Sequence, residues 1–304
     1  MNLHTELSGR YKLVVRKLSD IDESVKELEF PNIITDIGLD RWGVGAIGNR
    51  CMIGSGNATP SVSDTGLGAQ LAVTTNRREP TNWLSFSVEE RWTEVTVYYR
   101  FTPGVVLNSI AEVGIGWDTG IWSRALIRDG GGNPTTIQLL ADEVLDVYYT
   151  LRMQFPAADV TGSITLDGVA YDWVLRPSGV NTNPAYNHGW FLNSYGGSDP
   201  GYSAFGFSGN PITAVNTSPS IGAFASEKTI VPYVSGSKKQ RITYKAGLDT
   251  ANFPIKSVVA RPTGSQYATV EWQLGFYKDG AEIGIPKTSF KQLSLTFDFS
   301  WGRA

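Results

Sequence analysis

The chain has 304 residues, a formal net charge of −3, 18% charged residues and one cysteine. The single cysteine excludes an intramolecular disulfide and a multi-cysteine metal site. No run of lysine or arginine exceeds two residues, so the basic surface that binds nucleic acid is not expected. No segment reaches the roughly 18 apolar residues of a membrane helix, and residues 1–10 lack a secretory-signal pattern. We therefore expect that the protein is synthesised in a cytoplasm and does not insert into a membrane.

Alternation of apolar and polar residues dominates the chain, which predicts strands. Residues 10–18 form the first predicted strand, with Tyr11, Leu13 and Val15 on one face. Residues 19–24 allow two interpretations: the start of a short helix capped by Ser19, with Ile21, Val25 and Leu28 on one face, or a polar loop between two strands of a hairpin. We favour the hairpin, because residues 25–34 continue as an extended run through Pro31.

The middle of the chain contains short predicted strands separated by glycine and proline. Residues 54–81 resemble a loop, and residues 83–101 are expected to form a strand pair or one bent strand. Thr93, Val95, Val97, Tyr99 and Phe101 share one face of it. Short apolar runs follow at 111–117, 121–128 and 135–140, then a strong strand at 146–155. Asp167-Gly168 is a hairpin turn signal, and this spacing of strands is typical of a sandwich or barrel.

The composition changes near Arg176, where a long segment rich in Gly, Asn, Ser and Pro begins. Strands are predicted again at 221–226, 240–246, 254–260, 268–277 and 293–301. The last of these alternates most cleanly, so one of its faces must be buried. We predict an all-β protein with a β-sandwich-like domain at 1–178, a long aromatic and glycine-rich loop at 179–220, and a second β domain at 221–304.

Several motifs occur in order along the first 178 residues. The segment from Phe30 to Leu71 contains Gly38-Leu39-Asp40-Arg41, then Gly54-Ser55-Gly56 and Asp64-Thr65-Gly66-Leu67. Further landmarks are Gly114–Trp117, Ser123–Ile127, Gly131–Ile137 and Leu140–Val147. Together these motifs resemble the virion proteins of tailed bacteriophages, in particular tail, baseplate and tail-fibre components, over residues 10–178.

The resemblance implies a structural, non-enzymatic role in a virion, and it carries over no catalytic residue and no cofactor. It implies location in the phage tail, after assembly in the host cytoplasm. The expected partners are identical subunits in a trimer or ring, other virion proteins, and a glycan of the host surface as a further candidate. The motif segment is expected to be architectural, with turn backbones bonded by Asn32, Asp36, Asp40 and Asp64.

Patterns typical of enzymes are present but incomplete. Gly43–Gly48 matches a dinucleotide-binding pattern without the strand before it or the helix after it, so we interpret it as a turn. His4 and His188 are too few for a zinc site, and no nucleophile elbow supports a triad. Cys51 is expected to be a small buried hydrophobic residue.

Acidic residues leave a further alternative open. Paired carboxylates could hydrolyse a glycan, and the candidates are Glu89, Glu90, Asp118, Asp142, Glu143 and Asp146. We disfavour this glycan-degrading tail enzyme because the stacked repeats of a β-helix are missing. Asp20, Asp22 and Glu23 are interpreted as a solvated turn instead of a calcium loop.

One candidate binding site lies in the long loop. Trp190, Tyr195 and Tyr202 could form a stacking platform for a sugar, with Asn193 and Asp199 bonding its hydroxyls. This arrangement would make the chain a carbohydrate-recognition module. The alternative, which we favour, is that these aromatic residues fill an interface between subunits or the core of the loop itself.

Overall fold

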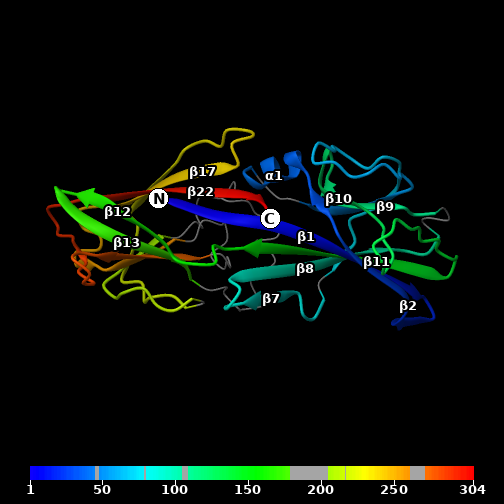
Figure 1. The fold of residues 1–304 in the computed structure, drawn as a ribbon, viewed down its shortest axis with the longest axis horizontal. Helices are drawn as coiled ribbons and strands as arrows, with labels where there is room; N and C mark the ends of the chain where they lie inside the picture. The colour runs from blue at the N-terminus through cyan, green and yellow to red at the C-terminus, as the bar shows by residue number, and fades with distance from the viewer. Residues whose placement is uncertain (45–47, 79, 105–108, 179–204, 216, 261–270) are drawn as a thin grey trace. The chain divides into compact units, whose positions relative to one another are not determined.

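The computed structural model describes the chain except residues 45–47, 79, 105–108, 179–204, 216 and 261–270 (Figure 1). The predicted all-β class is confirmed, since the described residues form strands and one short helix, α1 (Asp36–Trp42). No described helix has the length and apolarity that crossing a membrane requires. Two compact units make up the chain. Unit 1 comprises Met1–Thr5, Phe86–Trp92 and Gln154–Trp301, and unit 2 comprises Glu6–Ser85, Thr93–Met153 and Gly302–Ala304.

The strands of unit 2 form two sheets. One has the order β2-β1-β11-β8, with β6 and β7 beside β8, and the other has the order β3-β10-β9-β4-β5. Their bounds are β1 (Asn2–Lys17), β2 (Asp20–Pro31), β3 (Ile33–Ile34), β4 (Arg50–Gly54), β5 (Gln70–Thr74), β6 (Arg77–Arg78), β7 (Leu84–Ser87), β8 (Trp92–Phe101), β9 (Glu112–Trp117), β10 (Gly120–Leu126) and β11 (Glu143–Gln154).

Side chains connect the two sheets of unit 2 through its core. The Tyr11 hydroxyl of β1 lies 2.6 Å from Ser123 Oγ of β10. The Trp122 indole nitrogen of β10 donates to the Tyr149 hydroxyl of β11 at 2.7 Å. These polar side chains are buried, so each hydrogen bond satisfies a group that would otherwise be desolvated without a partner. The two bonds therefore fix the register between the facing sheets as well as filling the core.

The hairpin predicted near the start is confirmed, because β1 and β2 pair antiparallel. The solvated turn predicted for Asp20, Asp22 and Glu23 is wrong. β2 begins at Asp20, so these acids stand on a strand, and the turn shrinks to Leu18 and Ser19. The predicted loop at 54–81 likewise contains β5 and β6. The predicted buried face of β8, from Thr93 to Phe101, is confirmed.

Helix α1 was not expected inside the motif segment. Thr35 caps it, because its hydroxyl oxygen accepts a hydrogen bond from the Gly38 N–H at 2.9 Å. The same hydroxyl donates to the Ile121 carbonyl oxygen at 2.5 Å, which ties the start of the helix to β10. Asp36 lies in the first turn, where a carboxylate opposes the positive end of the helix dipole. Contacts with distant residues thus stabilise a helix that is too short to show a periodic apolar pattern in the sequence.

Unit 1 contains strands of three sheets. It holds the β16-β17-β22-β1 part of a nine-stranded sheet whose other strands were given above for unit 2, and two further sheets with the orders β12-β13-β20-β19-β14-β15 and β18-β21. The bounds are β12 (Val160–Leu166), β13 (Val169–Pro177), β14 (Phe205–Ser208), β15 (Ala223–Phe224), β16 (Glu227–Ile230), β17 (Lys239–Ala246), β18 (Pro254–Ile255), β19 (Ser257–Ala260), β20 (Trp272–Tyr277), β21 (Ile285–Pro286) and β22 (Leu293–Arg303).

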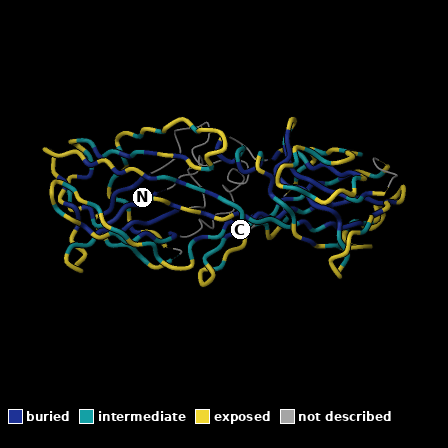
Figure 2. The backbone as a smooth tube through the Cα atoms, turned by 45° about the horizontal axis from the view of Figure 1, so that its top comes forward, coloured by how far each residue is buried: buried dark blue, intermediate teal, exposed yellow. Residues whose placement is uncertain are grey.

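An aromatic cluster fills the core of unit 1. The Phe205 ring of β14 stacks on Tyr244 of β17 with centroids 4.3 Å apart, and it lies 5.3 Å from Phe297 of β22. The alternation predicted for the last strand is confirmed, since its apolar residues from Leu293 to Trp301 are all buried. Figure 2 shows the same contrast, with buried strand segments in dark blue and exposed turns in yellow.

The predicted hairpin turn at Asp167-Gly168 is confirmed between β12 and β13. Both residues have positive φ, 50° and 78°, as a two-residue type I′ turn requires. Strands β1, β11 and β22 each contribute residues to both units, and the β12–β13 hairpin belongs to unit 1. The predicted domain division at residues 178 and 220 stays a prediction.

Candidate functional site

A buried carboxylate organises the loop that follows β4. Glu112 of β9 is fully buried. Its two oxygens accept hydrogen bonds from the backbone N–H groups of Gly56 (3.0 Å), Gly68 (3.0 Å) and Ala69 (2.8 Å). Arg124 of β10 donates to the same carboxylate at 2.8 Å. One side chain on a strand therefore fixes both ends of the loop between β4 and β5, residues 55–69, which we call the motif loop.

Arg124 extends this network to the tip of the loop. It donates to Asp64 at 2.7 Å and to the Ala58 carbonyl oxygen at 3.1 Å. Asp64 also accepts the Ser61 N–H at 2.9 Å, so it bonds a turn backbone as predicted. Because Arg124 is itself buried, each contact is a charge-assisted bond shielded from water. The network holds a loop of irregular backbone in one conformation.

The other predicted turn-bonding residues have different partners. Asp36 pairs with Arg303 at 2.5 Å, and the Asn32 amide donates to the Tyr149 hydroxyl at 3.3 Å. The backbone carbonyl oxygen of Asp40 accepts the Gly43 N–H at the end of α1. Turn bonding is therefore confirmed for Asp64, while Asp36 and Asn32 contact side chains of the distant strands β22 and β11.

The glycines of the motif allow the loop to approach Glu112. A Cβ atom at Gly56 would lie 2.4 Å from a Glu112 carboxylate oxygen, well inside van der Waals contact. A side chain there would displace the carboxylate and break its three backbone hydrogen bonds. The Gly-Ser-Gly pattern is therefore explained by the close approach of backbone to a buried charge.

The network also predicts how stability depends on pH. Burial raises the pKa of Glu112, but hydrogen bonds from Ala69, Gly68 and Arg124 outweigh it, so the pKa lies below its ordinary value. The stabilisation is therefore complete above the unfolded-state pKa of about 4.3, and it disappears as the pH falls through the folded-state pKa. We expect the unfolding free energy, measured by urea titration from pH 7 to pH 3, to fall less steeply for Glu112→Gln than for the wild type. Parallel pH profiles would contradict this.

The candidate catalytic carboxylates have separate partners. Glu90 accepts the Trp92 indole N–H, and Asp118 pairs with Arg50. Glu143 accepts the Leu140 N–H at 2.8 Å, and Arg100 binds Asp146 through two nitrogens. Within the described residues, no three His, Cys, Asp or Glu side chains are grouped to hold a metal ion. The glycan-degrading alternative stays a prediction.

Of the other residues that the sequence analysis singled out, some lie in described strands and some lie outside the described residues. His4 is part of β1 and lies 2.9 Å from Ser300 Oγ. Cys51 is buried, as predicted, and burial raises the pKa of its thiol. Gly43 ends α1, while residues 45–47 of the dinucleotide-like pattern lie outside the described residues. So do His188 and all five predicted glycan-binding residues, Trp190, Asn193, Tyr195, Asp199 and Tyr202.

A sheet edge stands out in unit 1. β12 is the first strand of its six-stranded sheet, and all seven of its residues pair with β13. In the part of the chain that the structure describes, no strand pairs with its other edge. Its sequence, Val-Thr-Gly-Ser-Ile-Thr-Leu, contains no charge and no proline. Such an edge presents unpaired backbone N–H and C=O groups to a further strand.

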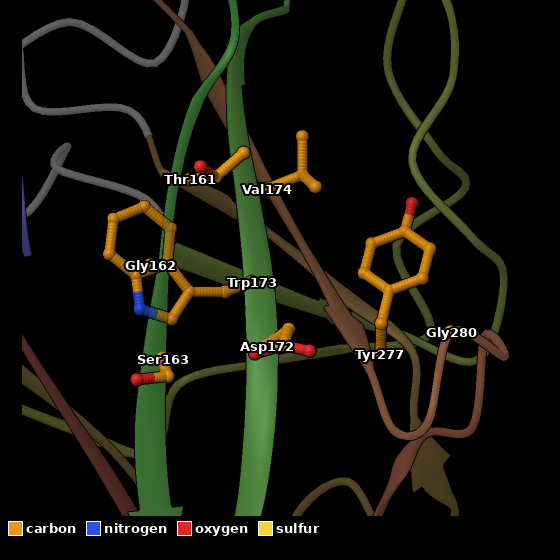
Figure 3. Close-up of a pocket in the computed structure, with 8 residues that line it drawn as sticks. All are labelled: Thr161, Gly162, Ser163, Asp172, Trp173, Val174, Tyr277 and Gly280. Carbon is orange, nitrogen blue, oxygen red and sulfur yellow. The ribbon is translucent and has the colours of Figure 1, made fainter.

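Figure 3 shows the surface beside this edge. A depression of about 460 Å³ is lined by residues of β12 and β13 together with Tyr277 and Gly280. The Trp173 indole lies across Gly162, and in the close-up it points away from Tyr277. Asp172 and Tyr277 are cross-strand neighbours, so their side chains share the opposite face. The edge strand is thus flanked by an apolar ring on one face and by polar groups on the other.

The other edge strands are protected or short. β2 carries charges along its length, including Asp20, Glu23 and Lys26, and its exposed side chains would repel a neighbouring copy. The uncharged edges β5 and β7 have five and four residues.

Comparison with protein-family models, curated proteins and solved structures finds no match. Among the edge strands, β12 is the long one without charge, so we take its edge as the candidate site. The sequence analysis did not predict this site. The signal available was a seven-residue strand without charge next to a two-residue turn.

Proposed function

We propose that this chain is a non-enzymatic structural component of a tailed-phage virion, of the tail, baseplate or tail-fibre kind, that assembles with identical copies. The β12 edge is the observation that supports assembly. An unprotected strand of seven residues can extend its sheet by adding a strand from another chain. The motif segment supports a structural role, because its backbone N–H groups and Asp64 belong to the network of Glu112 and Arg124 that holds a loop in place.

The sequence of β12 fits a second copy of itself. Antiparallel pairing about Ser163 places Thr161 opposite Thr165 and Val160 opposite Leu166. Gly162 would face Ile164, and each of these contacts occurs twice about the axis, as a two-fold interface requires. Thr–Thr and aliphatic cross-strand pairs each stabilise a sheet. The pairing would join two six-stranded sheets into one continuous sheet.

Charges next to the strand do not oppose this contact. Asp159, which precedes it, pairs with Arg176 at 2.5 Å, and Asp167 of the turn pairs with Lys291 at 2.6 Å. Both acids that flank the edge are thus neutralised within their own subunit. A second copy would meet no uncompensated charge along the seven paired residues.

Self-association can be measured with one substitution on the edge. We expect the purified wild type to have twice the 33.1 kDa monomer mass in light scattering. Ser163→Lys places two like charges face to face at the two-fold axis and should weaken association at least about tenfold. Thr229→Lys is the matched control, because it adds the same charge to an exposed position on another edge, β16. It should leave the mass unchanged.

The alternatives give different masses. A trimer or ring that Ser163→Lys does not disturb would contradict the β12 contact and leave an oligomeric virion protein intact. A monomer at all concentrations would contradict both. The virion role is tested separately by mass spectrometry of banded particles of the phage that encodes the chain. Peptides of the chain should band with the particles, and their confinement to the soluble fraction would overturn the proposal.

A further inference from the structure

A row of polar side chains crosses the outer face of four neighbouring strands in unit 2. The strands are β1, β11, β8 and β6, and the row is Arg16, Tyr148, Tyr98 and Arg78. Arg78 is directly opposite Tyr98 in the register of β6 and β8. The two phenol rings stack with centroids 4.7 Å apart and an interplanar angle of 20°. Two hydroxyl groups thus lie between two guanidinium groups.

These side chains line a cavity of about 370 Å³. This volume lies in the range of small-molecule sites, about 300–1,000 Å³. The lining differs from a typical ligand pocket, because charged and phenolic groups replace most aliphatic ones. A site of this composition favours a ligand that accepts several hydrogen bonds at once.

The charges of the cavity do not cancel. Asp146 is 1% exposed and accepts two hydrogen bonds from Arg100, at 2.6 and 2.7 Å. Arg16 shares the same carboxylate through a longer contact of 3.3 Å and also donates to the Asp22 carbonyl oxygen. One buried carboxylate therefore faces two guanidinium groups. Its bidentate bond to Arg100 neutralises the charge of that arginine, so the positive charge of Arg16 is only partly compensated.

Arg78 is the second uncompensated cation. It is exposed, and its guanidinium group has no hydrogen bond or ion pair with the side chains that the structure describes. Asp22 also lines the cavity and opposes the positive charge, so three arginines face two carboxylates. The cavity carries one net positive charge. An arginine fork matches the geometry of carboxylate and phosphate oxygens.

From these contacts we propose that the cavity binds an oxyanion, the carboxylate or phosphate group of a small molecule or of a glycan. Arg78 and Arg16 would hold its oxygens, and the Tyr98 and Tyr148 hydroxyls would donate further hydrogen bonds. Asp146 is a positioning residue that holds Arg100 and Arg16 in place. The inference goes beyond the proposed function and does not depend on assembly.

Calorimetric titration of the full chain at constant ionic strength tests the inference. The probes are inorganic phosphate, glucuronate and glucose, the last as a neutral sugar. We expect saturable binding of phosphate or glucuronate and none of glucose. Tighter binding of one anion identifies the group that the cavity prefers. The absence of saturable binding for both anions would overturn the proposal.

Substitutions distinguish a specific binding site from non-specific electrostatic attraction of anions. Arg78→Ala should weaken binding at least about tenfold, as expected for a lost bond to a charged group. Lys17→Ala is the matched control, since it removes one positive charge next to Arg16 from outside the cavity lining. It should change the affinity by less than about twofold. Asp22→Asn should tighten binding. Equal effects of the Arg78 and Lys17 substitutions would refute a specific site.

Discussion

Glu112→Ala is expected to lower the unfolding free energy by about 3–5 kcal/mol. The substitution leaves Arg124 buried beside Asp64 alone, and three backbone N–H groups lose their acceptor. Removing one member of a buried ion pair is strongly destabilising, because the remaining charge stays desolvated. Urea unfolding followed by tryptophan fluorescence measures the difference. The loop at 55–69 should also become sensitive to proteases, since the side chain that bonds both of its ends to β9 is gone.

Glu6→Ala is the matched control for this experiment. It removes the same side chain from an exposed position on β1 of the same unit. Substitutions at such positions usually change stability by no more than about 0.5 kcal/mol. Equal stability of the two variants would show that the Glu112 network does not hold the loop.

Phe205→Ala is expected to lower the unfolding free energy by a similar amount, about 3–5 kcal/mol. Phe205 is buried, and its ring contacts Tyr244, Phe297 and Phe207 with centroids 4.3, 5.3 and 5.2 Å away. The substitution opens a cavity among aromatic rings that belong to strands and cannot easily close it. Denaturant titration of the full chain gives the change.

Phe290→Ala provides the internal standard, because it makes the same chemical change at a side chain that is 91% exposed. It should leave stability within about 0.5 kcal/mol of the wild type. If Phe205→Ala behaves like Phe290→Ala, the aromatic cluster does not carry the stability of unit 1.

Strand positions were the most predictable part of the fold. The buried residues of β22 alternate with more exposed polar ones, and those of β8 alternate in the same way from Val95 to Phe101. This period of two follows directly from strand geometry. The turn at Asp167-Gly168 was predictable because few residues tolerate two positive φ angles in succession. Such signals are local, so the sequence contains them without any knowledge of the rest of the chain.

Other features depend on distant partners. Helix α1 has seven residues and is anchored by Thr35 on β10, some 86 positions later, which no local pattern reports. Glu112 and Arg124 each interrupt an apolar run, and such charges in predicted strands are a usable signal for a buried pair. The uncharged sequence of β12 can be seen in the chain, but its position at a sheet edge cannot, because that depends on which strands pair with β13.

The pairing of β1 with β22 has a consequence for synthesis on the ribosome. The Met1 nitrogen donates to the carbonyl oxygen of Thr296, 295 positions later. At about 5–20 residues per second, the ribosome needs roughly 15–60 s to produce that partner. During this interval the part of β1 that pairs with β22 has no backbone partner. The sheets of this chain depend largely on such non-local contacts. This pairing can therefore form only late in translation, when nearly the whole chain has been made.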